Sequence, residues 1–144
     1  MLIALHILLG VLVGAAFVFA TRTLARRHEL NVYAAGLVAA ALVYVVFAVA
    51  NGAPGRWLVI EFTALAGFSL LALSRLKSSP LSLAALWAAH ALWDLLIHAD
   101  AVTHAGGGDV HIVPDWYRLV CAGFDFALAA YLLPLSRRAT AHAR

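Results

Sequence analysis

Long apolar runs separated by short polar stretches dominate the sequence. Five such runs cover residues 2–21, 32–52, 57–74, 81–99 and 116–135. Because a helix rises about 1.5 Å per residue and the hydrocarbon core of a bilayer is about 30 Å thick, about 20 apolar residues are enough to cross it. The pattern predicts an all-α integral membrane protein, a compact bundle of five transmembrane helices.

The composition agrees with this interpretation. The 144 residues are 65% hydrophobic and 12% charged, with a mean hydropathy of +0.93, whereas soluble domains are about 25% charged. The length predicts a single transmembrane domain over residues 1–144. We expect a multi-pass protein of the bacterial cytoplasmic (inner) membrane, with the lipid bilayer as a partner. The first run lacks a preceding basic segment, so we expect it to be retained as a span.

Basic residues lie in short clusters between the runs. Of the ten Lys and Arg residues, eight fall in the first loop, the third loop and the tail: Arg22, Arg26, Arg27, Arg75, Lys77, Arg137, Arg138 and Arg144. The positive-inside rule then predicts that the N-terminus is outside and the C-terminus inside. These clusters set orientation, so the net charge of +3 does not indicate a nucleic-acid partner.

In the first run, His6, Gly10 and Gly14 recur every four residues. A Gly-x-x-x-Gly element lets two helix backbones approach closely. We therefore expect this face to point into the bundle and to take His6 with it. The single Cys121 excludes an internal disulfide and cysteine-rich metal motifs.

The segment WAAHALWDLLIH, residues 87–98, places His90, Asp94 and His98 at successive i+4 positions. Three ionisable side chains thus share one face of a predicted membrane helix, where such groups are costly and usually functional. His90 and His98 are about 12 Å apart along the axis, too far to bind one zinc ion together. His90 with Asp94, or Asp94 with His98, can chelate, and a two-metal site bridged by Asp94 would use all three.

Other ionisable residues fall in the same outer half of the predicted spans. Glu61 and Asp125 lie roughly 6 and 13 Å inside the outer ends of their runs, and His6 is also in the outer half. A polar cavity shared by four helices and open to the outside would explain this distribution. Alternatively, these groups only link helices, for instance Glu61 with His90 or Asp125 with Arg118.

The predicted outer loop after residue 98 is rich in His and Asp. His104, His111 and Asp115 are secondary candidates for metal ligands, together with His6. They lack the compact spacing of a zinc motif. The alternative is a solvated loop without a metal.

Arg118 is a candidate for binding a lipid phosphate or a substrate carboxylate, because guanidinium matches these groups bidentately. It can equally be the counter-ion of Asp115 or Asp125. Tyr44 and Asn51 share a face of the second run and can complete the cavity by hydrogen bonding.

Three elements carry a resemblance to a known family: the H-x-x-x-D of His90 and Asp94, the VPDWY segment at 113–117, and the C-x-x-x-D of Cys121 and Asp125. Over most of its length the chain resembles bacterial membrane proteins of the family called domain of unknown function 6010. The resemblance implies a compact bacterial membrane domain and no established activity.

His90 and Asp94 are also similar in type to residues of the ceramidase-like intramembrane metal hydrolases, which use Ser, Asp and three His. Here Leu86 stands where the serine would be, and Asp125 replaces a His pair on the last helix. The ceramidase pattern is therefore not met.

Three functions fit these residues. The first is an intramembrane enzyme, a hydrolase or an isomerase or cyclase, acting on a lipidic or amphipathic small molecule from the outer leaflet. Its candidate catalytic groups are Asp94, Asp125 and Glu61. A divalent metal such as zinc would be held by His90, Asp94 and a carboxylate such as Glu61 or Asp125, with His98 as a further candidate ligand. Without a metal, the carboxylates and a histidine could still carry out acid–base chemistry. The second is a proton-coupled or metal transporter, in which a homo-oligomer would complete the polar path. The third is a non-catalytic binding or accessory subunit.

Overall fold

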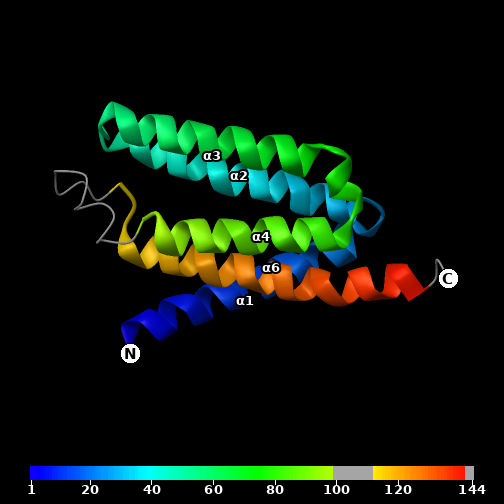
Figure 1. The fold of residues 1–144 in the computed structure, drawn as a ribbon. Helices are drawn as coiled ribbons and strands as arrows, with labels where there is room; N and C mark the ends of the chain where they lie inside the picture. The colour runs from blue at the N-terminus through cyan, green and yellow to red at the C-terminus, as the bar shows by residue number, and fades with distance from the viewer. Residues whose placement is uncertain (99–111, 142–144) are drawn as a thin grey trace.

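The computed structural model describes residues 1–98 and 112–141 and forms an antiparallel helical bundle (Figure 1). Within these residues there are five α-helices and no strand, which confirms the all-α prediction. The helices are α1 (Leu2–Leu24), α2 (Glu29–Ala50), α3 (Gly55–Leu73), α4 (Pro80–Leu96) and α6 (Asp115–Ala141). Short 3-10 turns over Arg26–His28 and Arg75–Ser78 join α1 to α2 and α3 to α4.

Four of these helices are long and apolar enough to cross a membrane: α1, α2, α3 and α6. The apolar α4 has 17 residues and is about 26 Å long, slightly less than the thickness of a hydrocarbon core. It begins at Pro80, where the Ser79 hydroxyl accepts a hydrogen bond from the Ser82 N–H. It ends at Leu96, so the predicted run to residue 99 was too long at this end.

The helices alternate between two ends of the bundle (Figure 1). We call them the Asn51 end, which also holds Met1 and Asp115, and the Arg27 end, which holds Arg75–Ser78 and the last turn of α6. This up-and-down arrangement agrees with the predicted alternation. Which end faces the cytoplasm stays a prediction.

Glycine closes the turn at the Asn51 end. Gly52 has φ of +62°, a left-handed conformation that suits glycine because it lacks a Cβ. The next N–H, of Ala53, donates to the Ala48 carbonyl at 2.9 Å and so ends α2. Pro54 then precedes the first turn of α3, as is common at helix N-termini.

The helices α1 and α6 pack backbone against backbone. A Cβ added to Gly10 would lie 2.0 Å from the Val120 carbonyl oxygen, and one added to Gly123 would lie 2.2 Å from the Ile7 carbonyl oxygen. A Cβ added to Gly14 would lie 3.0 Å from the Phe124 carbonyl oxygen of α6, a less close approach. The close approach predicted from Gly-x-x-x-Gly is confirmed, and it holds α6 in place for the polar residues described below.

The middle of the bundle is filled by apolar and aromatic side chains. Tyr33, Leu83, Trp87 and Leu128 are fully buried together between α2, α4 and α6. At the Arg27 end the carboxylate of Glu29 accepts hydrogen bonds from the Tyr33 and Tyr131 hydroxyls. By their positions along α3, α4 and α6, the buried carboxylates and the buried histidine of these helices lie nearer the Asn51 end: Glu61, His90, Asp94 and Asp125.

Candidate functional site

The buried face of α4 carries the first two residues of the site. Trp87, His90, Ala91 and Asp94 recur at three- and four-residue spacing and are all buried, because such positions share one face of a helix. His90 is 1% exposed and Asp94 is 0% exposed. The helix therefore turns its polar groups away from lipid and toward α6.

Asp125 of α6 meets this face. Its Oδ2 lies 2.7 Å from Nδ1 of His90, in a buried hydrogen bond. The same Nδ1 is 3.7 Å from Oδ1 of Asp94. One ligand atom from each of these three residues lies within 4.8 Å of the others, so His90, Asp94 and Asp125 form a compact group that we call the triad.

Asp94 is the least satisfied member of the triad. Both of its carboxylate oxygens are buried and make no hydrogen bond to a described residue. The Tyr44 hydroxyl is near this carboxylate but not in hydrogen-bonding geometry. Buried polar groups are nearly always hydrogen-bonded or bound to a metal, so this carboxylate is suited to a ligand.

Glu61 and His98 form a second pair. Glu61 is on α3, whereas His98 follows the end of α4 in a turn. His98 Nε2 and Glu61 Oε1 are 3.4 Å apart, both side chains are buried, and neither of these atoms makes a hydrogen bond to a described residue. The sequence predicted that His98 shares a helical face with His90 and Asp94. This prediction is wrong for His98, because α4 ends at Leu96.

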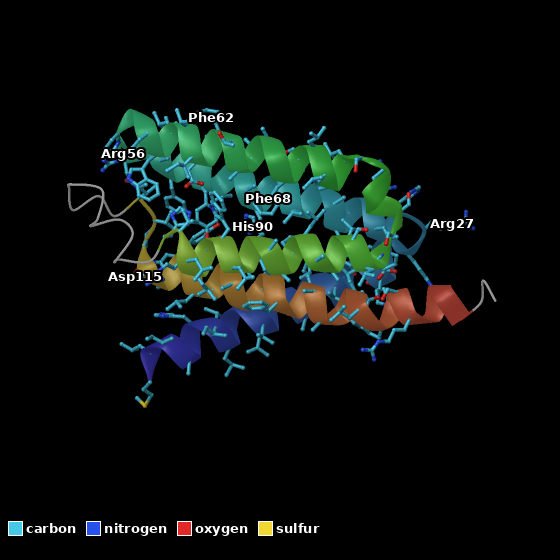
Figure 2. All side chains as sticks on the ribbon, viewed as in Figure 1. Arg27, Arg56, Phe62, Phe68, His90 and Asp115 are labelled. Carbon is cyan, nitrogen blue, oxygen red and sulfur yellow. The ribbon has the colours of Figure 1, made fainter. Side chains whose placement is uncertain are left out.

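Aromatic rings surround both groups. The Tyr44 ring stacks on His98 with centroids 4.7 Å apart and meets the His90 ring edge-on at 5.8 Å. The Trp57 ring also stacks on the His98 ring, with centroids 6.4 Å apart. Phe68 lies 5.0 Å from His90 and faces it across the space between α3 and α4 (Figure 2). The triad and the second pair are therefore enclosed in apolar walls.

Described residues also close the Asn51 end. The Asn51 side-chain amide donates to the Ile112 carbonyl at 2.8 Å, which holds the segment before α6 across the bundle. Ile112 and Val113 are 1% and 5% exposed and pack with Tyr44 and Trp57. The predicted cavity open to the outside is thus corrected to an enclosed polar cluster, and Asn51 acts as a tether rather than as part of a cavity wall.

The structure also corrects the two predicted linking pairs. Glu61 pairs with His98 and not with His90, while Asp125 pairs with His90 and not with Arg118. The Nε of Arg118 instead donates to Oδ1 of Asp115 at 2.9 Å. These partners differ because they depend on how the helices are rotated and offset, which the spacing along one helix does not determine.

The remaining candidates lie apart from the triad or outside the described residues. His6 is partly buried on α1 and is not one of the three clustered ligand residues. Asp115 lies at the start of α6 at the Asn51 end. His104 and His111 fall outside residues 1–98 and 112–141, so their roles stay predictions.

Trp57 and Phe68 were missed as residues of the site. Trp57 is 3% exposed and packs on His98. Trp57 is four residues before Glu61 and Phe68 is seven residues after it, so all three share one face of α3. That spacing is the signal that would have found them, whereas Phe62 of the same helix points out of the bundle (Figure 2).

The cluster contains the side-chain types that bind divalent metals. Three carboxylates, of Glu61, Asp94 and Asp125, lie here beside two imidazoles, and both groups are zinc ligands in proteins. Ligands around tetrahedral zinc at 2.0–2.1 Å are about 3.4 Å from one another. One ligand atom from each residue of the triad lies within 4.8 Å of the others, so the three residues could hold a small divalent ion.

A model of the family of unknown function DUF6010 matches residues 5–138, nearly the whole chain, and the matched region includes every residue of the triad and of the second pair. No curated protein and no solved structure matches the chain. The earlier resemblance is confirmed: the chain belongs to the family of unknown function DUF6010.

Proposed function

We propose that this protein is an intramembrane enzyme with a divalent metal at His90, Asp94 and Asp125, acting on a lipidic or amphipathic substrate. One observation carries the proposal: the fully buried Asp94 carboxylate has no hydrogen bond to a described residue, yet lies beside a histidine and a second aspartate. A bound cation supplies the missing partner for this carboxylate and neutralises charge that the apolar surroundings disfavour.

Each residue of the cluster has a distinct task in this proposal. His90, Asp94 and Asp125 hold the ion, which would polarise a substrate oxygen or activate a water for hydrolysis or isomerisation. Glu61 and His98 are the proton donor and acceptor, because their facing atoms, Oε1 and Nε2, are buried and make no hydrogen bond to described residues. The aromatic rings exclude water from the reacting groups.

The location of the cluster supports an enzyme over a carrier. A transporter needs polar groups that continue toward the other side of the membrane. Between the triad and Glu29, the buried positions Leu37, Leu83 and Trp87 are apolar. A reaction centre in one half of the bundle needs no such path.

Elemental analysis tests the metal site. The protein is purified in detergent without chelators, dialysed against Zn²⁺ and then against buffer. We expect about one metal ion per chain in the wild type and background levels in Asp94→Asn and Asp125→Asn. Asp115→Asn is the matched control, because this carboxylate is outside the triad and pairs with Arg118; it should keep the metal.

Two outcomes contradict the metal proposal: a wild-type protein that holds no metal after dialysis, or an equal loss in Asp115→Asn. The enzymatic step is tested in proteoliposomes of total bacterial lipid, followed by mass spectrometry of the extracted lipids. We expect one lipid species to change with time in the wild type and to stay constant in Asp94→Asn. Identical lipid profiles for the two proteins would overturn the enzymatic role.

A further inference from the structure

An apolar groove runs along the lipid-facing side of the bundle between α3 and α4. It has a volume of about 260 Å³ and is lined by Thr63, Ala64, Gly67, Phe68, Leu71 and Trp93. Five of these come from α3, where residues 63 and 71 are about 12 Å apart along the axis. The groove therefore runs along α3, with Trp93 of α4 beside it.

The floor of the groove is a glycine with space above it. A Cβ added to Gly67 would meet nothing within 4 Å. The side chains along the groove are apolar apart from Thr63. In a bilayer such a surface contacts hydrocarbon, and a chain lying in the groove would fill space that the protein leaves open.

Phe68 separates this groove from the triad. The same ring lines the groove, lies 5.0 Å from the His90 ring, and meets the Trp93 ring edge-on at 6.4 Å. Rotation of one phenyl side chain would therefore connect the groove to His90, and through it to Asp94, which is 3.7 Å from the imidazole. The polar cluster is one ring away from the lipid-facing surface.

The groove runs from the middle of the bundle toward the Arg27 end. Thr63 is near the middle of α3, and Leu71 is two residues before the end of this helix. A lipid whose polar group reached the triad would therefore have its chain directed along the groove toward the Arg27 end. Ile112, Val113 and Trp57 close the bundle at the Asn51 end, so the groove offers a route from the side.

We propose that the groove between α3 and α4 binds the hydrocarbon chain of the substrate, and that Phe68 rotates to admit the attached polar group to the triad. The substrate class is a lipid with a flexible apolar chain that enters sideways from the bilayer. This inference rests on the proposed function for the fate of the polar group, whereas binding of the chain in the groove can be measured by itself.

Photo-labelling tests the groove. The full chain is reconstituted in phosphatidylglycerol and phosphatidylethanolamine vesicles that contain a phospholipid with a diazirine on its acyl chain. We expect labelling of α3 and α4 at the groove residues. Gly67→Leu should lower it at least fivefold, because the new side chain occupies the groove. Val59→Phe adds bulk on a lipid-exposed face of the same helix outside the groove and should leave the labelling unchanged.

Ala64→Leu is a second way to fill the groove and should have the same effect if Gly67→Leu is poorly folded by circular dichroism. Equal labelling of the groove in the wild type and in a folded groove-filling variant overturns the inference. An equal loss in Val59→Phe overturns it as well, because the effect would then not be specific to the groove.

Metal analysis of the same samples separates this inference from the proposed function. We expect Gly67→Leu to keep its metal while it loses the label, and Asp94→Asn to lose its metal while it keeps the label. Groove-specific labelling without any metal in the wild type would overturn the metal centre and leave the lipid groove. Metal binding in the wild type with no groove-specific label would overturn the lipid groove and leave the metal centre.

Discussion

Two helix interfaces of this bundle differ in how they use glycine. Between α1 and α6, Gly10 faces the Val120 carbonyl oxygen so closely that an added Cβ would be 2.0 Å from it, while Gly67 beside α4 has nothing within 4 Å of its added Cβ. The first interface is backbone packed against backbone, which leaves no room for a ligand. The second is open to lipid and adjoins the buried ionisable cluster.

This difference suggests a division of roles. The contact between α1 and α6 has no freedom to adjust, so it holds α6 and therefore Asp125 at a fixed position. The interface between α3 and α4 places Phe68, a single side chain, between the groove and His90. Rigidity on one side and an opening on the other are what a site supplied from the bilayer requires.

The largest expected effect is at the tight interface. Gly10→Leu would place a side chain against backbone atoms of α6. A backbone cannot shift aside as a flexible side chain can. We expect it to lower the free energy of unfolding by about 3 kcal/mol or more, measured by thermal unfolding in detergent. Gly67→Leu should stay within about 0.5 kcal/mol of the wild type. If both variants lose the same stability, the contrast between the two interfaces is wrong.

The next effect is the coupling of metal to stability at the triad. With Zn²⁺ at about one hundred times its dissociation constant, we expect the wild type to gain about 2.7 kcal/mol. Asp94→Asn should gain nothing, and its metal-free form should be at least as stable as the metal-free wild type, because a neutral amide replaces a buried unpaired charge. Thermal unfolding with and without EDTA measures both. An equal Zn²⁺ response in the two proteins would argue against Asp94 as a ligand.

A smaller effect is expected where the Asn51 end is closed. Asn51→Ala removes the hydrogen bond to the Ile112 carbonyl and should cost about 1 kcal/mol. Hydrogen exchange should become faster in the peptide that contains Ile112 and Val113. Asn31→Ala, at an exposed position near the other end of α2, is the control and should leave this peptide unchanged. Unchanged exchange in Asn51→Ala would show that the tether does not close the bundle.

The smallest effect is expected at Arg118. Its partner Asp115 is 54% exposed, and ion pairs in contact with water contribute about 0–1 kcal/mol. We expect Arg118→Ala to change the free energy of unfolding by less than about 1 kcal/mol and to leave Zn²⁺ binding at the triad unchanged. Calorimetric titration with Zn²⁺ checks the second point. If Arg118→Ala bound Zn²⁺ ten times more weakly than the wild type, Arg118 would belong to the site around Asp125 after all.

Features that repeat along one helix were predictable from the sequence. The apolar runs predicted the helical bundle, and the four-residue spacing of His90 and Asp94 placed both on one buried face of α4. The Gly-x-x-x-Gly of α1 predicted a close helix contact. These predictions hold because helical periodicity is local and depends only on neighbouring residues.

The partners across helices were decided by the tertiary structure. The sequence placed Glu61, His90 and Asp125 in the same half of the bundle, but it did not determine that Asp125 meets His90 while Glu61 meets His98. Nor did it predict that Trp57 packs inward. Such pairings depend on the rotation and offset of each helix, which contacts between distant residues such as Gly10 and Val120 set, and no repeat within a single helix encodes them.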